Sequence, residues 1–463
     1  MCGIFGISNH PEAARLTYLG LYSLQHRGQE AAGIVSVDAE GVARSHKGSG
    51  LVSDVFSEDV IKSLEGTTAI GHTRYSTAGG SAEVNTQPFL VRYREGTLSI
   101  AHNGNLTNAA QLRRELVNEG AILQSTADTE AFIHLIARSP RTAPEDQIRE
   151  AVLRAEGAYS LLITVNDVMY AVVDPRGFRP MMLGRVDKAI VAASESCALD
   201  IVGAKQVCEL APGSFVKIQG GKVIDLDPLP VTEKPKHCVF ELVYFSRPDS
   251  MVFEESVHEY RLNLGRQLAK EHPAPGADCV FSVPDSSNAA ALGFSRESGV
   301  PFEHGLIRNH YVGRTFIHPV QSGRDAKVKI KYNAVRDIIA GKRVVVVDDS
   351  IVRGTTSRGL VRMIRDAGAK AVHFRVASPP ITGPCYYGID TPTREELIAA
   401  SHSVEDIRKF LDVDSLGYLS LEGMLGASAH SPDRFCSACW SGQYPTEIPA
   451  EATTSGFVEE PAV

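Results

Sequence analysis

The stretch 341-GKRVVVVDDSIVRGTTS-357 decides the fold of the second half of the chain. Its four consecutive valines are β-branched and apolar, which is typical of a strand that is covered on both faces. Two aspartates end this strand. After a turn, the spacing predicts a helix from about Thr355 that Gly368 terminates. A further apolar run over 371–377 predicts the next strand, so the stretch belongs to a βαβ unit.

This strand, turn and helix predict an anion site. Unpaired backbone N–H groups and the positive end of the helix lie at the carboxyl edge of such a sheet, where phosphates bind. Gly354 permits close approach of the backbone, and Thr355 and Thr356 add hydroxyl donors. Asp348 and Asp349 suit sugar hydroxyls or Mg²⁺. The alternative is an ordinary turn with solvated acids. It is not a Walker A loop, because Gly-x-x-x-x-Gly-Lys-Ser/Thr is missing.

The same stretch resembles the phosphoribosyl-pyrophosphate (PRPP) signature of type I phosphoribosyltransferases. The resemblance implies that the two aspartates contact the ribose hydroxyls and a metal, and that the turn after them holds the 5′-phosphate. It also matches the turn 282–287 to the family's pyrophosphate loop. The implied Mg²⁺ ligands are Ser286, Asp348 and Asp349. The implied PRPP-binding residues are Asp348, Asp349, Ser350, Ile351, Val352, Arg353, Gly354, Thr355 and Thr356.

A basic stretch between Arg308 and Arg343 lies between these two turns. A run of charges is usually a solvated surface, but beside two anion-binding turns it predicts a mobile lid over a polyanionic substrate. This lid, which contains Arg324, is expected to close over PRPP and exclude water. His318 and Tyr332 depart from the family's usual residues in this lid.

Cys2 directly follows the initiator methionine. Once the methionine is removed, the α-amine of Cys2, with a pKa of about 7.7–8.0, can act as base for its own thiol. A small buried apolar residue is the alternative. Arg74 offers a guanidinium that can clamp a carboxylate. Asn103 and Gly104 could form an oxyanion hole or merely an Asn-Gly turn, and Asp128 could simply cap a helix.

Together these segments resemble, in order, the glutaminase domain of N-terminal-nucleophile amidotransferases. The resemblance implies that Cys2 is the nucleophile and that Asn103 and Gly104 form the oxyanion hole. It further implies that Arg74 binds the α-carboxylate of glutamine and that Asp128 binds the α-ammonium. The implied fold is a four-layer αββα sandwich.

Eight cysteines are too few for a disulfide scaffold in 463 residues. The pair Cys436 and Cys439 alone fits a zinc site, a redox dithiol or neither. The whole chain, however, resembles the family of glutamine PRPP amidotransferases of the iron–sulfur-containing type. That resemblance implies a [4Fe–4S] cluster on Cys238, Cys385, Cys436 and Cys439, with a Zn–Cys₄ site as the competitor. We interpret the remaining three as packing residues: Cys197, Cys208 and Cys279.

We therefore expect two domains and a tail. Residues 2–230 are predicted to form an α+β, N-terminal-nucleophile-type glutaminase domain, in which the motif 27–30 has a supporting structural role. A Pro-rich, polar stretch then marks a boundary. Residues 231–442 are predicted to form an α/β, parallel-sheet, type I phosphoribosyltransferase domain with the iron–sulfur ligands. The Pro- and Glu-rich residues 443–463 are predicted to be a flexible tail.

Composition narrows the class of protein. The 47 Lys and Arg against 55 Asp and Glu give a net charge of −8, which argues against a nucleic-acid partner. No apolar run approaches the roughly 18 residues of a membrane-spanning helix, and the N-terminus lacks the pattern of a secretory signal. A cytoplasmic, multidomain enzyme is expected.

The resemblance implies one overall reaction. Ammonia from glutamine attacks PRPP and yields 5-phosphoribosylamine, pyrophosphate and glutamate, the first committed step of de novo purine (IMP) biosynthesis. It also implies a homotetramer inhibited by purine nucleotides. One alternative is another Cys2 amidotransferase, such as a glucosamine-6-phosphate synthase, which would lack the 344–357 signature. The other is a non-enzymatic regulator that senses PRPP.

Overall fold

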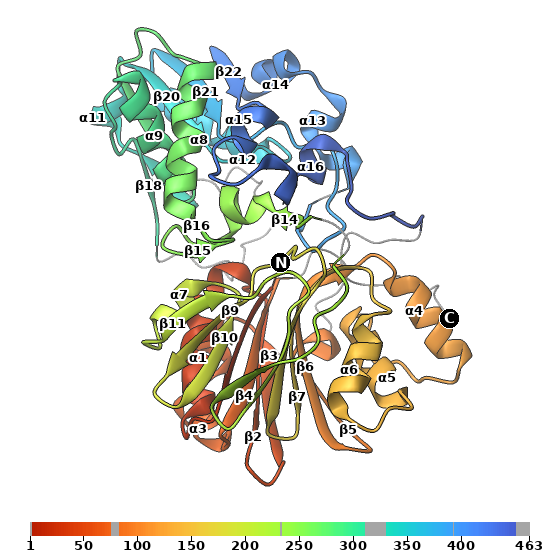
Figure 1. Ribbon diagram of the computed structural model, residues 1–463. Helices are drawn as coiled ribbons and strands as arrows, with labels where there is room; N and C mark the ends of the chain where they lie inside the picture. The colour runs from red at the N-terminus through yellow and green to blue at the C-terminus, as the bar shows by residue number, and fades with distance from the viewer. Residues whose placement is uncertain (1, 76–82, 232–233, 311–329, 392, 451–463) are drawn as a thin grey trace.

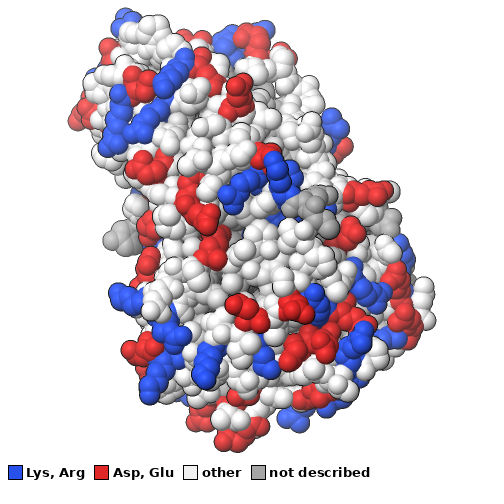
Figure 2. All heavy atoms as spheres, viewed as in Figure 1, with Lys and Arg blue, Asp and Glu red and all other residues white. Residues whose placement is uncertain are grey.

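The computed structural model describes residues 2–75, 83–231, 234–310, 330–391 and 393–450. Figure 1 shows two domains stacked on each other, with the N-terminus at the junction between them. No helix of the described residues is long and apolar enough to cross a membrane. Lys and Arg are interspersed with Asp and Glu on the face shown in Figure 2.

The first domain contains two antiparallel sheets. The seven-stranded sheet has the order β11-β9-β10-β1-β4-β2-β3. Its strands are β1 (Gly3–Ser8), β2 (Ala31–Val37), β3 (Ala43–Ser49), β4 (Thr68–Arg74), β9 (Met182–Val186), β10 (Ala189–Ala193) and β11 (Lys205–Glu209). The six-stranded sheet has the order β13-β12-β8-β7-β6-β5. Its strands are β5 (Phe89–Tyr93), β6 (Gly96–Leu106), β7 (Gly157–Val165), β8 (Val168–Val173), β12 (Phe215–Gln219) and β13 (Lys222–Asp225).

Alternation along β1 explains the layers. Ile4 points into a core between the two sheets, which it shares with Leu162 of β7, whereas Phe5 and Ile7 face the helices on the outer side. A third core packs helices on the six-stranded sheet. The first group of helices is α1 (Ala13–Ser23), α2 (Val52–Val55), α3 (Glu58–Ser63) and α7 (Ser196–Asp200); the second is α4 (Ala109–Asn118), α5 (Thr129–Arg138) and α6 (Pro144–Val152). The predicted αββα sandwich is confirmed.

The second domain is built on a parallel sheet of order β17-β20-β21-β22. The strands are β17 (Cys279–Ser282), β20 (Arg343–Asp348), β21 (Ala371–Val376) and β22 (Ser415–Tyr418). Val344 and Val346 pack against one layer of helices, while Val345 and Val347 pack against the other. All four are fully buried, so the prediction of a strand covered on both faces is confirmed.

The helices of this domain are α8 (Val257–Glu271), α9 (Asn288–Ser298), α11 (Arg336–Ile339), α12 (Thr355–Asp366), α13 (Ile398–Ser401), α14 (Val404–Leu411), α15 (Leu421–Leu425) and α16 (Ala438–Ser441). Three further strand pairs are β14 (His237–Cys238) with β23 (Phe435–Cys436), β15 (Met251–Val252) with β16 (Glu255–Ser256), and β18 (Leu306–Arg308) with β19 (Tyr332–Ala334). A π-helical turn, η3 (Glu241–Phe245), leads from β14 toward α8.

Two predictions need correction. Cys197 and Cys279 are buried, as expected of packing residues, but Cys208 is exposed because it lies on β11, an edge strand of its sheet. The predicted flexible tail is also wrong at its start. The Tyr444 hydroxyl donates a hydrogen bond to the Pro384 carbonyl at 2.6 Å, and the Thr446 N–H donates to the Tyr387 hydroxyl at 3.1 Å. Residues 451–463 lie outside the described residues, as do His318 and Arg324 of the predicted lid.

Candidate active sites and cysteine cluster

Cys2 lies at the head of β1, an interior strand held between β4 and β10. The backbone N–H of Cys2 donates to Asn103 Oδ1 at 3.4 Å. Since Asn103 belongs to β6 in the other sheet, the contact spans the sandwich. The structure therefore brings the predicted nucleophile and the predicted oxyanion residue together.

The Cys2 thiol is electrostatically perturbed by a neighbour that the sequence prediction missed. Burial acts to raise the pKa of this thiol, but the charge and the hydrogen bond of His72, together with smaller contributions that include a hydrogen bond to the Tyr75 backbone, lower the pKa to about 6. His72 is fully buried on β4. A signal existed: His72 precedes Arg74 by two residues, so both lie on one face of the strand.

Asn103 and Gly104 have the features of an oxyanion hole. Within the described parts of the chain, the buried Asn103 Nδ2 has no hydrogen-bond partner. Such an unpaired buried donor is costly and is suited to a substrate oxygen. Gly104 lies so close to β7 that a Cβ would collide with the Ala158 carbonyl oxygen, which explains glycine at this position.

Arg74 and Asp128 lie at the edge of the same site. Burial lowers the pKa of the Arg74 guanidinium, while the charges of Cys2 and Glu30 favour its charged form. The Leu106 backbone N–H donates to Asp128 Oδ2 at 2.9 Å, which places this carboxylate beside the end of β6. All five predicted glutaminase residues therefore lie around the head of β1 and the end of β6.

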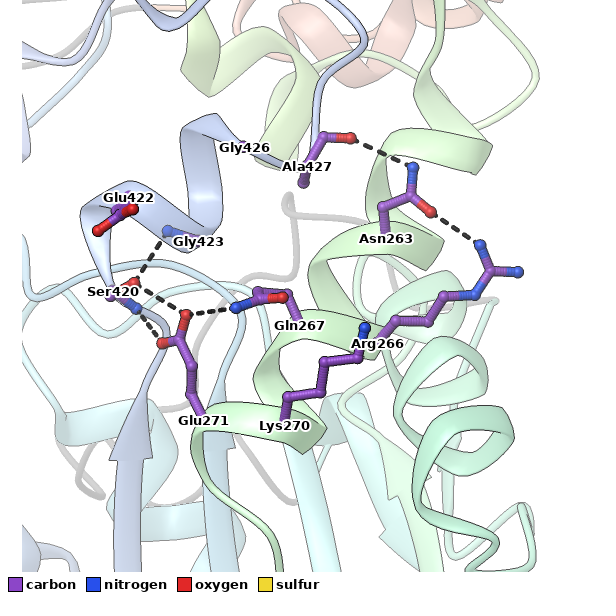
Figure 3. Close-up of a pocket in the computed structure, with 10 residues that line it drawn as sticks. All are labelled: Asn263, Arg266, Gln267, Lys270, Glu271, Ser420, Glu422, Gly423, Gly426 and Ala427. Atoms are coloured by element: carbon purple, nitrogen blue, oxygen red, sulfur yellow. Dashed lines mark hydrogen bonds between the residues drawn. The ribbon is translucent and has the colours of Figure 1, made fainter.

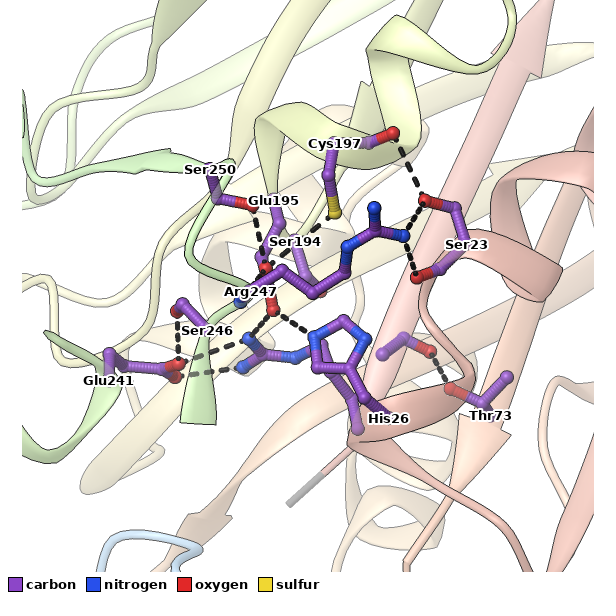
Figure 4. Close-up of polar contacts among 12 residues, drawn as sticks. Ser23, His26, Thr73, Ser194, Glu195, Cys197, Glu241, Ser246, Arg247 and Ser250 are labelled. Carbon is purple, nitrogen blue, oxygen red and sulfur yellow. Dashed lines mark hydrogen bonds and ion pairs between the residues drawn. The ribbon is translucent and has the colours of Figure 1, made fainter. Parts of the chain in front are cut away.

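A buried ionic network contacts the backbone of Cys2, and its two carboxylates, Glu195 and Glu241, are labelled in Figure 4. Arg27 Nε donates to the Cys2 carbonyl at 3.0 Å, and its terminal nitrogens contact Glu195 and Glu241, with 2.8 Å from Nη2 to Glu241 Oε1. All three charged side chains are fully buried. The pKa of Glu241 is lowered: burial opposes this, but Arg27 and Arg179 outweigh it. Glu241 comes from η3, so the second domain completes the support of the nucleophile.

The carboxyl ends of β17 and β20 bring the two predicted PRPP turns together. The Ser286 hydroxyl donates to Asp349 Oδ2 at 2.5 Å, and the Ser287 hydroxyl contacts both aspartates. Burial raises the pKa of Asp348, and the neighbouring Asp349 raises it further. Two close, buried carboxylates with adjoining hydroxyls form an oxygen donor set that fits Mg²⁺.

The turn after the aspartates leads directly into α12. Gly354 has a φ of +72° and precedes the first helical residue, so the N-terminal N–H groups of the helix face the sheet edge. The Arg353 side chain instead pairs with Glu396, 3.1 Å from Nη2 to Oε2. Arg353, one of the predicted phosphate-binding residues, can therefore bind a phosphate through its backbone N–H rather than through its side chain.

The four predicted cluster cysteines gather at the junction of the domains. Cys238 and Cys436 are partners in parallel register, and all four are buried and free of disulfides. Burial raises the pKa of Cys238 to about 11, and the charge of Cys385 adds to this although Arg179 opposes it. Likewise, Cys439 interacts electrostatically with the other three.

These cysteines fit an iron–sulfur cluster, because four close, buried thiols with a neighbouring guanidinium suit a multi-iron group with one thiolate per iron. Among the described residues, no group of three or more His, Cys, Asp or Glu side chains is placed to hold a metal ion.

A separate polar pocket of about 540 Å³ lies between α8 and α15 (Figure 3). Glu271 crosses it to accept from the Ser420 backbone N–H at 2.7 Å. No predicted site residue lines this pocket, so it is distinct from both active sites.

The fold and the sites define a two-domain amidotransferase, with an N-terminal-cysteine glutaminase joined to a phosphoribosyltransferase. A family model described as a glutamine amidotransferase domain matches residues 72–200. The amidophosphoribosyltransferase of Bacillus subtilis is 49% identical over 452 residues, covering 96% of this chain and 94% of that protein. That of Archaeoglobus fulgidus is 47% identical over 460 residues, covering 97% and 99%. The chain belongs to the amidophosphoribosyltransferase family.

Solved structures agree with this membership. One, described as the allosteric regulatory enzyme of purine biosynthesis, has a TM-score of 0.94 and 48% identity, with 98% of each chain covered. The B. subtilis glutamine PRPP amidotransferase complexed with ADP and GMP has a TM-score of 0.92 and 47% identity, covering 98% of this chain and 99% of that one. The predictions of an enzyme that transfers glutamine-derived ammonia to PRPP, in purine biosynthesis, are confirmed. The two alternatives, a glucosamine-6-phosphate synthase and a non-enzymatic regulator that senses PRPP, are not confirmed.

Proposed function

We propose that the two sites divide the reaction, with glutamine hydrolysis at Cys2 and transfer of ammonia to PRPP at Asp348 and Asp349. The observation that carries this proposal is the buried Asn103 Nδ2, which has no hydrogen-bond partner among the described residues, on a side chain whose Oδ1 accepts from the Cys2 backbone N–H. A thiol next to an unused hydrogen-bond donor is suited to acyl transfer. The second half of the chain adds an anion-binding turn that hydrolysis alone does not need.

In the glutaminase half, Arg74 holds the α-carboxylate of glutamine and Asp128 holds the α-ammonium. The Cys2 thiol attacks the side-chain amide carbon, with the amine freed by methionine removal taking the thiol proton. Asn103 Nδ2 and the Gly104 N–H stabilise the negative oxygen of the tetrahedral intermediate. Collapse releases ammonia, and water then hydrolyses the thioester to glutamate.

In the transferase half, Ser286, Asp348 and Asp349 would hold Mg²⁺, which supplies charge neutralisation for the departing pyrophosphate. The backbone N–H groups of the turn 350–356 hold the 5′-phosphate, and the aspartates orient the ribose. Ammonia then attacks the anomeric carbon as pyrophosphate leaves.

The remaining proposals concern the whole protein. Cys238, Cys385, Cys436 and Cys439 would hold a [4Fe–4S] cluster, which gives a brown protein, whereas zinc is colourless. A homotetramer located in the cytoplasm is proposed. Purine nucleotides are proposed as feedback inhibitors, supported by the relative that was solved with ADP and GMP.

The test of the proposed function is stoichiometry. Anaerobically purified protein is given glutamine, PRPP and Mg²⁺, and glutamate, pyrophosphate and phosphoribosylamine are measured together. We expect the three products in equal amounts. Pyrophosphate release without matching glutamate, or glutamate without pyrophosphate at saturating PRPP, would reject the coupled division of labour.

A further inference from the structure

A segment of the second domain, Cys385–Gly388, lies directly on the oxyanion turn of the first. Asn105 Nδ2 donates to the Tyr386 carbonyl at 2.8 Å. Gly388 approaches so closely that a Cβ there would lie 2.9 Å from the carbonyl carbon and oxygen of Gly104. Gly388 also has a φ of +100°, which disfavours any side chain.

Gly104 is therefore enclosed on two sides. Ala158 of β7 blocks one side, since a Cβ on Gly104 would collide with its carbonyl oxygen, and Gly388 packs against the backbone from the second domain. A backbone held between two other backbones has little room to rotate its N–H group. An oxyanion hole needs that direction fixed, because the donor must point at the oxygen position of the transition state.

The segment is itself anchored to the first domain. Arg179 Nη2 donates to the Tyr387 carbonyl at 2.6 Å, and the Tyr387 ring stacks on Phe178 with centroids 4.3 Å apart. Arg179 also pairs with Glu241, 3.2 Å from Nη1 to Oε1. Buried contacts on both faces thus fix the segment in place. Because the segment cannot move, it restricts the backbone of Gly104.

We propose that Asn105 and Gly388 are positioning residues for glutamine hydrolysis, and that the second domain completes the oxyanion hole through the segment Cys385–Gly388. This inference rests on the proposed role of Asn103 and Gly104. The inference means that contacts between the domains help to set the rate of glutamine hydrolysis, although the residues that contact glutamine lie in the first domain.

The first test is Gly388→Ala, with Gly383→Ala as the matched control. A Cβ at Gly383 meets the end of the Tyr444 side chain at 3.1 Å and no part of the oxyanion turn. We expect Gly388→Ala to lower the glutamine-dependent kcat by about 100-fold, the lower end of the roughly 100- to 1,000-fold loss on removing one oxyanion donor. KM for glutamine should stay within about twofold, because the lost interaction forms only in the transition state.

The ammonia-dependent synthesis of phosphoribosylamine reports on the second domain. It should stay within about twofold in Gly388→Ala and in Gly383→Ala, because neither residue contacts the PRPP turns. If Gly388→Ala lowers both activities equally, the segment supports the fold in general and the inference is overturned.

The second test is Asn105→Ala, which adds no bulk and remains informative if Gly388→Ala fails to fold. The matched control is Asn108→Ala, which removes the hydrogen bonds that the Asn108 side chain makes with the backbone of Arg154 and Glu156. The γ-aldehyde analogue of glutamine serves as probe, since the Cys2 sulfur adds to its carbonyl carbon and the proton moves to the oxygen. Asn105→Ala should weaken this inhibitor about tenfold, whereas Asn108→Ala should not.

Asn103→Ala separates the inference from the function beneath it. If Asn103→Ala keeps full glutamine-dependent activity, the proposed oxyanion hole itself is wrong. If Asn103→Ala loses activity while Asn105→Ala and Gly388→Ala keep both kcat and inhibitor affinity, the hole stands and the role of the segment is rejected.

Discussion

The two active sites of this chain are held in different ways. Cys2 lies at the head of an interior strand, with a fully buried arginine on its carbonyl and the second sheet in contact with its backbone N–H. Asp348 and Asp349 sit at the end of a strand, where the residues after them form a turn and a helix start. The first site is held by contacts from two sheets and from a buried arginine, and its Cys2 is half-buried. The second site is built from buried carboxylates at the carboxyl edge of a parallel sheet, where anionic substrates bind.

This contrast predicts that damage to one site need not reach the other. Cys2→Ala should abolish glutamine-dependent synthesis, because no other group can form the thioester, while synthesis from ammonium salts continues. Both activities are measured as pyrophosphate release from PRPP. Loss of the two together in folded protein would contradict separate sites.

The buried network should matter more to stability than any surface pair. Glu241→Gln leaves Arg27 and Arg179 short of a compensating charge, and breaking a buried pair costs about 3–5 kcal/mol. We expect a clearly lower urea midpoint. The control is Glu58→Gln, which loses the exposed, solvent-screened pair with Arg15 and should leave the urea midpoint almost unchanged. Equal midpoints for the two variants would show that the network is not a stabilising element.

At the sheet-edge site, Asp349→Asn should lower turnover of PRPP by about 100-fold, on the scale of losing one charged transition-state contact. Cys2 should still react with a glutamine-derived affinity label in the absence of PRPP. The measurement pairs ammonia-dependent pyrophosphate release with mass analysis of the N-terminal peptide. Failure of labelling would mean that the transferase aspartates shape the glutaminase site at rest.

The Cys2 thiol should report its surroundings through pH. Because its pKa is lowered to about 6, alkylation by iodoacetamide should rise with pH through about 6 and level off above it, whereas an ordinary thiol titrates near about 8.5. His72→Gln removes the main lowering influence and should move this midpoint upward by about one unit or more. His46→Gln, on β3, should leave it in place. If the midpoint does not move in His72→Gln, His72 is not the group that lowers the pKa of the Cys2 thiol.

The smallest effect is expected on the transferase turn itself. Arg353→Ala breaks an exposed pair with Glu396 but keeps the backbone N–H groups, so KM for PRPP should change by about twofold at most. A tenfold or larger rise in KM would show that the side chain leaves Glu396 to bind the substrate phosphate.

Whether the sequence could predict a region depends on how far apart along the chain the contacting residues lie. The valines of β20 predicted a buried strand because alternation and β-branching are local properties. The positions of Cys2, Asn103 and Asp128 came from the order of motifs along the chain. Glu241 escaped prediction because its partner Arg27 lies 214 residues away, and only the packed domains bring them together.

Errors arose where local composition conflicted with tertiary position. Cys208 reads as an ordinary packing residue, yet its strand lies at the edge of the sheet. Tyr444 lies in a polar, Pro-rich stretch, yet its ring packs against Tyr386 with centroids 5.3 Å apart. Neither the edge position nor this docking leaves a periodic signal in the sequence.

The placement of Glu241 bears on whether the front half of the molecule can be used as a module. A fragment cut at residue 230 would keep Arg27 and Glu195 but lose the carboxylate that shares this guanidinium. It would also expose Phe178, which packs in a core shared with the back half. Neither half is self-sufficient at the cut, so shuffling this glutaminase onto a new acceptor enzyme would require grafting the η3 turn along with it.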